Sequence, residues 1–140
     1  MILMDGTNSG TETGQQEHIQ IFIWRIPKKN HDAMIQNCKR AVSTHTRYDQ
    51  RLEFFRLDSA MLGSEYGCTN IDNIIPSSGK DDEEEVWLEI NFHKDRKHMD
   101  DVAVTRQMED SESADPIGKQ FMDLIIPGSC LEGGFGRIRV

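Results

Sequence analysis

The sequence predicts one α+β domain in which an antiparallel sheet carries helices on one face. Three observations lead to this fold class. A chain of 140 residues is long enough for one domain with a core and too short for two. Several segments have apolar residues at strand spacing. The segments that follow them have apolar residues at helical spacing, so strands and helices share one layered domain.

The strand at 18–27 is the centre of this prediction. Side chains alternate along a strand, and both of its faces are apolar, with Ile19, Ile21 and Ile23 on one and Phe22, Trp24 and Ile26 on the other. A strand of this kind needs apolar cover on both sides. One short chain supplies helices for one face, so we expect a second copy of the chain to cover the other.

The first half of the domain follows from capping and spacing. Residues 1–17 are almost entirely polar after Met4 and predict a flexible tail before a single domain at 18–140. Asn30 is a helix N-cap, and the apolar stripe that follows ends at His45. A second strand is expected at 51–58. The glycine- and serine-rich segment 59–80 predicts a long loop insertion.

The second half adds two strands and two helices. A strand is expected at 86–93 after an acidic run, and Asp95 caps the next helix. Asp115 and Pro116 start a short third helix, and the last strand is expected at 133–140. The order is that of the ferredoxin-like βαββαβ fold, with helices on one sheet face. The bare face predicts a homodimer, in which two stacked sheets form a dimeric α/β barrel.

Composition excludes several classes of partner. A net charge of −8 repels nucleic acid and anionic membranes, so neither is an expected partner. No apolar run approaches the roughly 20 residues of a membrane span, and we expect no signal peptide. Three cysteines without paired spacing predict a cytoplasmic protein. We expect neither a metal site nor a cofactor, because no ligand or phosphate-loop motif is present.

The candidate catalytic group is His98 with Arg96 and Asp100, at the start of the second helix. Histidine titrates near neutral pH and acts as a base where geometry allows, and the arginine could hold an anion. The alternative is structural: Asp100 serves the helix N-terminus and His98 makes a hydrogen bond to a loop.

The candidate ligand-binding residues come from the strands and the first helix. His45, Phe22 and Trp24 are expected in a pocket between helices and sheet. Glu89, Asn91 and His93 share one strand face, and Arg25 or Arg137 is expected to pair with Glu89. Such a pair fits either the dimer interface, where it sets the register, or a polar pocket.

Four short segments resemble the YbaA-like proteins, a family of unknown function within the dimeric α/β-barrel superfamily. They are the end of the first strand at 26–30, Leu52-Glu53-Phe54, the helix start at 96–100, and Gly133-Gly134-Phe135. The chain departs from the family at Met99, where the family has arginine. The resemblance implies the fold and a dimer, and it implies no reaction.

Three functional hypotheses follow from these observations. The first is a small-molecule-binding or accessory module. The second is an enzyme, a cofactor-independent monooxygenase or isomerase, with His98 as its base. The third is a purely structural dimer without a ligand. The superfamily that the chain resembles contains oxygenases, haem-degrading enzymes and binding proteins, so fold alone does not choose between them.

Overall fold

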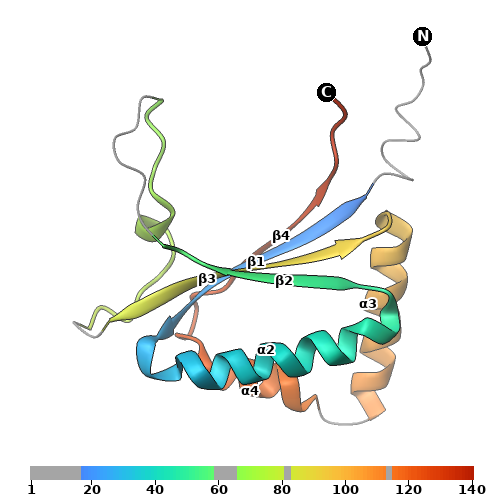
Figure 1. The fold of residues 1–140 in the computed structure, drawn as a ribbon, viewed down its shortest axis with the longest axis horizontal. Helices are drawn as coiled ribbons and strands as arrows, with labels where there is room; N and C mark the ends of the chain where they lie inside the picture. Colours follow the sequence, from blue (N-terminus) through green and yellow to red (C-terminus); the bar gives the residue numbers. More distant parts are fainter. Residues whose placement is uncertain (1–16, 59–65, 81–82, 113–114) are drawn as a thin grey trace.

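The computed structural model describes residues 17–58, 66–80, 83–112 and 115–140, and its backbone is an α+β fold (Figure 1). This confirms the predicted fold class at the level of an antiparallel sheet with helices. The strands are β1 (His18–Pro27), β2 (Arg51–Arg56), β3 (Glu84–His93) and β4 (Leu131–Gly136). The helices are α2 (His31–His45), α3 (Arg96–Glu112) and α4 (Pro116–Leu124), with short 3-10 turns η1 (Lys28–Asn30), η2 (Thr46–Tyr48) and η3 (Ile71–Asn73).

The four strands form one sheet in the order β2-β3-β1-β4, and every neighbouring pair is antiparallel. The central strand β1 pairs with β3 along its full length, from His18 opposite His93 to Pro27 opposite Glu84. Since β1 and β2 are both antiparallel to β3, they run in the same direction with β3 between them. β3 and β4 likewise run in the same direction, with β1 between them.

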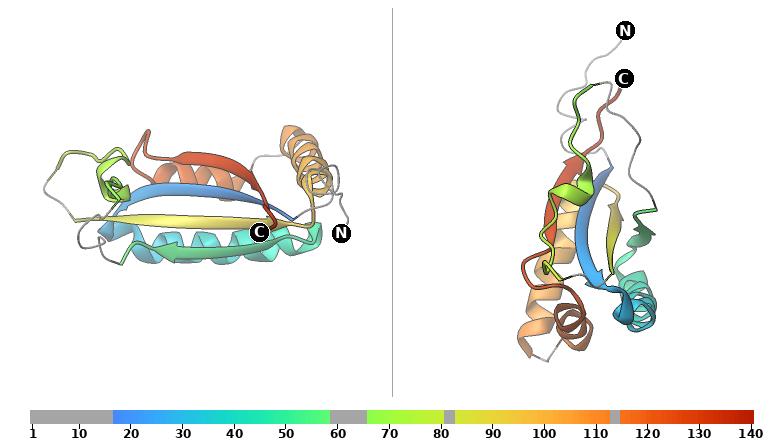
Figure 2. Two further views of the ribbon diagram at one scale, coloured as in Figure 1. Left: turned by 90° about the horizontal axis from the view of Figure 1, so that it is seen from above. Right: turned by 90° about the vertical axis from the view of Figure 1, so that its left-hand side faces the viewer.

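Helices α2 and α4 cover one face of this sheet, and α3 lies across one end of it (Figures 1 and 2). Under this face is the hydrophobic core, in which Trp24, Ile26 and Met34 are fully buried. The ring of Trp24 stacks on Trp87 at 6.2 Å between centroids and meets the edge of Phe121 at 4.9 Å. Burial of large aromatic side chains is the main apolar contribution to the stability of such a layer.

The helix starts show how the local sequence sets the fold. Asp95 accepts a hydrogen bond from the His98 backbone N–H at 2.8 Å, and Asp115 accepts one from Gly118 at 3.0 Å. Both act as N-caps, as the sequence predicts. Asn30 occupies the N-cap position of α2 without a capping bond. Its side chain instead donates to the Leu124 carbonyl at 3.0 Å, which ties the start of α2 to the end of α4.

Several boundaries differ from the sequence prediction. The acidic, serine-rich composition of 109–115 predicts a solvated connection, but α3 continues into this segment as far as Glu112. β3 starts two residues earlier than expected, and β4 ends at Gly136 instead of Val140. The predicted tail and part of the long loop lie outside the described residues. Within the described part of the chain, no helix combines the length and apolar composition that crossing a membrane requires.

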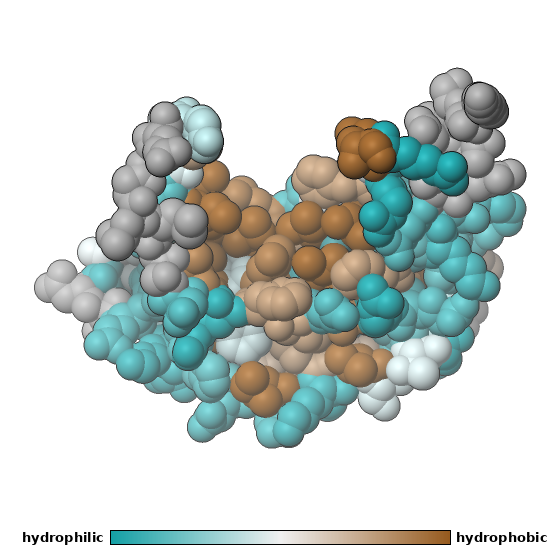
Figure 3. Space-filling model, turned by 45° about the horizontal axis from the view of Figure 1, so that its top comes forward, coloured by the Kyte–Doolittle hydropathy of each residue, from teal (hydrophilic) through white to brown (hydrophobic). Residues whose placement is uncertain are grey.

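The other face of the sheet carries no helix and is apolar (Figure 3). We call it the open face. Its side chains follow from the strand registers and come from all four strands: Ile19, Ile21, Ile23, Phe55, Leu57, Leu88, Ile90, Phe92, Leu131 and Phe135. Phe55 and Phe135 are about half exposed, at 48% and 52%. Exposed apolar surface shared by four strands is typical of an interface.

One end of the open face is covered by the chain segment around Asp72. Arg25 donates to the Asp72 carboxylate at 3.0 Å, and to the backbone carbonyls of Asp72 and Ile75 at 2.8 and 2.9 Å. The guanidinium is buried, and a second carboxylate, Glu84, lies 3.6 Å from its Nε. The predicted pair between Arg25 and Glu89 is therefore wrong. The two side chains leave the sheet on opposite faces because they stand at positions of opposite parity in the β1–β3 ladder.

Candidate functional site

A cavity of about 190 Å³ lies between the sheet and its helices, and we call it the helix-side cavity. It is lined by residues from β1, β2, β3, α2, α3 and α4: Phe22, Trp24, Met34, Asn37, Cys38, Ala41, His45, Phe54, Glu89, Asn91, Arg106, Ile117, Gly118 and Phe121. Apolar walls with a few polar groups are typical of small-molecule sites. A neighbouring hollow of about 410 Å³ shares Phe22, Asn91 and Arg106 with it.

Strand register brings the cavity residues of the sheet together. Glu89 of β3 stands opposite Phe22 on β1 and opposite Phe54 on β2. Asn91 is two residues further along β3, so its side chain leaves the sheet on the same face. The alternation that buries Trp24 against the helices therefore also directs Glu89 and Asn91 into the cavity.

The Glu89 carboxyl group is the titratable acid of this cavity. Burial raises its pKa from the ordinary value of 4.5 to about 7. Hydrogen bonding to Asn91 and the positive charge of Arg106 act in the opposite direction and are weaker. An acid with a pKa near neutrality can both accept and return a proton under physiological conditions.

His45 and Arg106 form a second polar pair in the wall. The Arg106 Nη1 donates to His45 Nε2 at 2.6 Å, and His45 Nδ1 donates to the Ala41 carbonyl at 2.7 Å. These contacts require the neutral imidazole. Burial lowers the pKa of His45, while the Ala41 hydrogen bond raises it and the charge of Arg106 lowers it further. Among the described residues, no carboxylate forms an ion pair with Arg106.

Two buried polar atoms beside the cavity lack a hydrogen-bond partner. They are the indole Nε1 of Trp24, which is a donor, and the Oδ1 of Asn91, which is an acceptor. The two residues are 0% and 5% exposed, respectively. An unpaired buried polar group costs roughly 1–3 kcal/mol, so nearly all such groups in folded proteins are paired. Here a donor and an acceptor belong to residues that line one cavity, which favours a ligand with both functions.

The structure brings five of the predicted ligand-binding residues together in the helix-side cavity: Phe22, Trp24, His45, Glu89 and Asn91. His93 is on the same strand face but lies beyond the cavity, with its Nε2 3.0 Å from the Gln20 side-chain oxygen. Arg137 lies after β4 and pairs with Glu17, so its predicted pair with Glu89 is wrong. The face of β3 that carries Glu89 packs toward the helices. Glu89 therefore does not lie on the open face, where a dimer contact is expected.

The predicted catalytic residues do not form a cluster around a cavity. His98 Nε2 donates to the Tyr48 carbonyl at 2.8 Å, and Nδ1 accepts from the Lys94 backbone N–H at 3.2 Å. Both ring nitrogens are therefore used by the backbone. Arg96 and Asp100 form an exposed i,i+4 ion pair at 3.3 Å, away from the His98 ring nitrogens. The His98 contacts match the structural alternative stated for that residue, whereas Asp100 pairs with Arg96 and the helix N-terminus is capped by Asp95.

The His98→Ala variant is expected to lose stability. Its imidazole joins the start of α3 to the turn after α2, and its removal leaves the Tyr48 carbonyl and the Lys94 amide without this partner. Loss of two such hydrogen bonds should lower the free energy of unfolding by roughly 1–3 kcal/mol. Urea unfolding measures this change. An unchanged midpoint would show that neither bond contributes to folding.

Sequence reasoning missed part of the cavity. Arg106 follows Met99, Val102 and Ala103 at helical spacing, which predicts that it lies on the inner stripe of the helix after Asp95. A charged residue on such a stripe was the available signal for a buried polar site. No such signal was available for Phe54, Asn37 and Phe121. An apolar or amide side chain that faces the core has the same sequence spacing whether the core is filled or contains a cavity. Cys38 faces the cavity as a thiol whose pKa burial raises to about 12, with a smaller contribution from Glu89.

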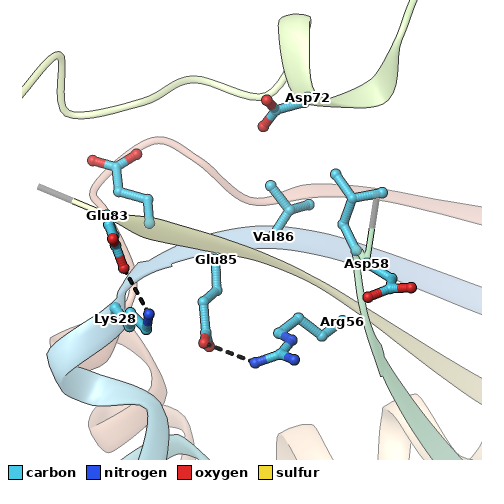
Figure 4. Close-up of a pocket in the computed structure, with 9 residues that line it drawn as sticks. Lys28, Arg56, Asp58, Asp72, Glu83, Glu85 and Val86 are labelled. Atoms are coloured by element: carbon cyan, nitrogen blue, oxygen red, sulfur yellow. Dashed lines mark hydrogen bonds and ion pairs between the residues drawn. The ribbon is translucent and has the colours of Figure 1, made fainter. Parts of the chain in front are cut away.

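A larger hollow of about 510 Å³ lies at the other end of β3 and is acidic (Figure 4). Four of its five carboxylates lie near a cation: Glu83 pairs with Lys28 at 2.6 Å, Glu85 with Arg56 at 3.2 Å, and Asp72 and Glu84 lie 3.0 and 3.6 Å from Arg25. Glu85 also accepts from His31 and from the Trp87 indole. Since most of these carboxylates already have a cationic partner within the chain, we place the candidate ligand site in the helix-side cavity. In the described part of the chain, no three histidine, cysteine or acidic residues are grouped to hold a metal ion.

Comparison with known proteins adds no family or relative to this geometry: no protein-family model matches the chain, and no curated protein is significantly similar to it.

Proposed function

We propose that this protein is a small-molecule-binding module whose site is the helix-side cavity. The observation that carries the proposal is the pair of unpartnered buried groups, the Trp24 Nε1 donor and the Asn91 Oδ1 acceptor, at one aromatic-walled cavity. A ligand oxygen that accepts from the first, or a ligand N–H or O–H that donates to the second, would supply the missing hydrogen bond.

The expected ligand is an uncharged, single-ring compound that carries a hydroxyl or carbonyl group. A cavity of about 150 Å³ lined by apolar side chains binds benzene, and the helix-side cavity is somewhat larger at about 190 Å³. Aromatic rings from Phe22, Phe54 and Phe121 supply apolar contacts for such a ring. The carbonyl or hydroxyl then selects ligands, because a site with buried polar groups rejects analogues that leave them unpaired.

The proposed assembly is a homodimer of ferredoxin-like subunits, with the two open faces in contact. The strand order and the antiparallel pairing support this topology, and so does the parallel relation of β1 to β2. The charges on the open face are compensated within one copy: Arg51 lies 3.3 Å from Glu53 and stacks on Phe92, so two copies of the face would not repel. A YbaA-like dimeric α/β barrel, and a cytoplasmic location, remain predictions from the sequence.

Titration with phenol and toluene tests the binding site by calorimetry. Phenol should bind, and toluene should bind at least roughly tenfold more weakly, because it has no group for Trp24 and Asn91. Ala41→Leu places three extra carbons at the cavity wall and should abolish phenol binding. Ala33→Leu makes the same change on an exposed position of α2 and should leave phenol binding intact. Equal binding of phenol by both variants would place the phenol site elsewhere.

A further inference from the structure

The helix-side cavity contains a proton acceptor and a cation that face the same space. Glu89 comes from β3 and Arg106 from α3, and both line the cavity. The Arg106 guanidinium contacts the neutral His45 ring through Nη1, and its other N–H groups have no hydrogen-bond partner within the described part of the chain. Such an arrangement can remove a proton from a bound molecule and stabilise the negative charge that develops on it.

Glu89 is the only one of three titratable groups in this wall that can exchange a proton with a ligand. Both His45 ring nitrogens are committed, to the Ala41 carbonyl and to Arg106. The Cys38 thiol stays protonated, because burial raises its pKa to about 12. The Glu89 carboxyl, by contrast, is bound only through Asn91 and keeps an oxygen for a ligand.

From this geometry we infer that the cavity is an isomerase site, in which Glu89 transfers a proton between two carbons of a small cyclic unsaturated ketone and Arg106 faces the ketone oxygen. The inference rests on the proposed function, because the cavity must first admit a ring. It assigns acid–base chemistry to Glu89 and not to His98.

The reaction balances without a cofactor or a second substrate. The Glu89 carboxylate takes a proton from the carbon between the carbonyl and the double bond of a β,γ-unsaturated ketone. The electron pair of that C–H bond moves into a dienolate, whose oxygen carries the negative charge beside Arg106. The protonated Glu89 then returns the proton to the γ carbon, which gives the conjugated ketone and regenerates the carboxylate.

The test uses cyclohex-3-en-1-one as the probe and follows its conversion to cyclohex-2-en-1-one by ultraviolet absorbance. The wild-type protein should accelerate the conversion, and the rate should fall as the pH is lowered through about 7, where Glu89 becomes protonated. Glu89→Gln should lower the rate by at least about a hundredfold. Glu83→Gln changes an exposed carboxyl group on the acidic hollow and should not alter it.

A second pair of variants tests the cation. Arg106→Gln should lower the rate constant by about a hundredfold, and Arg106→Lys should recover part of it. Phenol, a planar analogue of the dienol, separates the two proposals when its binding is measured on the same protein. Phenol binding without Glu89-dependent isomerisation would overturn the isomerase inference and leave the binding module standing. No phenol binding and no isomerisation would overturn both.

Discussion

The Glu89→Gln substitution is expected to stabilise the protein more at about pH 8 than at about pH 4. Between these two pH values, the free energy of unfolding of the variant minus that of the wild-type protein should rise by roughly 3 kcal/mol. In the folded protein the pKa of Glu89 is about 7, and its ordinary value is 4.5. The unfolded chain therefore releases this proton at lower pH than the folded chain does. The stability that Glu89 contributes is present below pH 4.5 and is lost as the pH rises to 7.

Glutamine removes this loss because it stays neutral at every pH. Other groups titrate as well: burial lowers the pKa of His93 to about 4, with smaller effects of the neighbouring histidines His98, His18 and His45. His93 thus contributes stability above pH 6.5 that is lost as the pH falls toward 4, the opposite sign. It is present in both proteins and cancels in their difference. Urea unfolding of both proteins across this range gives the difference directly.

Glu83→Gln is the control, since Glu83 is exposed just before β3 and the hydrogen bond from Lys28 lowers its pKa. This variant should therefore gain no stability over the wild-type protein toward pH 8. A constant difference between Glu89→Gln and wild type from pH 4 to pH 8 would mean that the Glu89 carboxyl is solvated and does not lie in the helix-side cavity.

The Ile21→Glu variant is expected to be a monomer under conditions where the wild-type protein is a dimer. Ile21 is near the centre of the open face, opposite Ile90 on β3 and Gly133 on β4. In a two-fold interface each substitution occurs twice, and burying an unpaired carboxylate is highly unfavourable. The dissociation constant should rise by more than about a hundredfold, which corresponds to roughly 3 kcal/mol.

Light scattering at about 10 µM measures this change. The wild-type protein should have twice the chain mass of 16.0 kDa, and Ile21→Glu should have the mass of one chain. Val104→Glu introduces the same charge at an exposed position of α3 and should remain a dimer. A wild-type protein of 16.0 kDa at this concentration would show that the open face is not a self-association surface.

The sequence predicts the strands and helices well where one physical signal dominates. The double apolar alternation of β1 and the Asp115-Pro116 start of α4 are local signals, and both elements occur where they are expected. The acidic segment after Arg106 predicted a solvated connection, because its composition resembles a loop. The backbone of α3 continues into it as far as Glu112.

The candidate site is only partly encoded in local patterns. Alternation places Glu89 and Asn91 on one face of their strand, and it does not say whether that face meets helices or a second copy. This depends on how β1 pairs with β3, which requires contacts far apart in the sequence. The contact between Arg106 and His45 is likewise long-range, since it joins α3 to the end of α2.

The indole N–H resonances of the two tryptophans provide the most direct test of the ligand site. Trp87 Nε1 donates to Glu85 at 2.9 Å, whereas Trp24 Nε1 has no partner. In a nitrogen–proton correlation spectrum, added phenol should shift the Trp24 indole signal and the Asn91 side-chain amide, and should leave the Trp87 indole signal in place. A saturating phenol titration that shifts neither the Trp24 signal nor the Asn91 signal would contradict binding in the helix-side cavity.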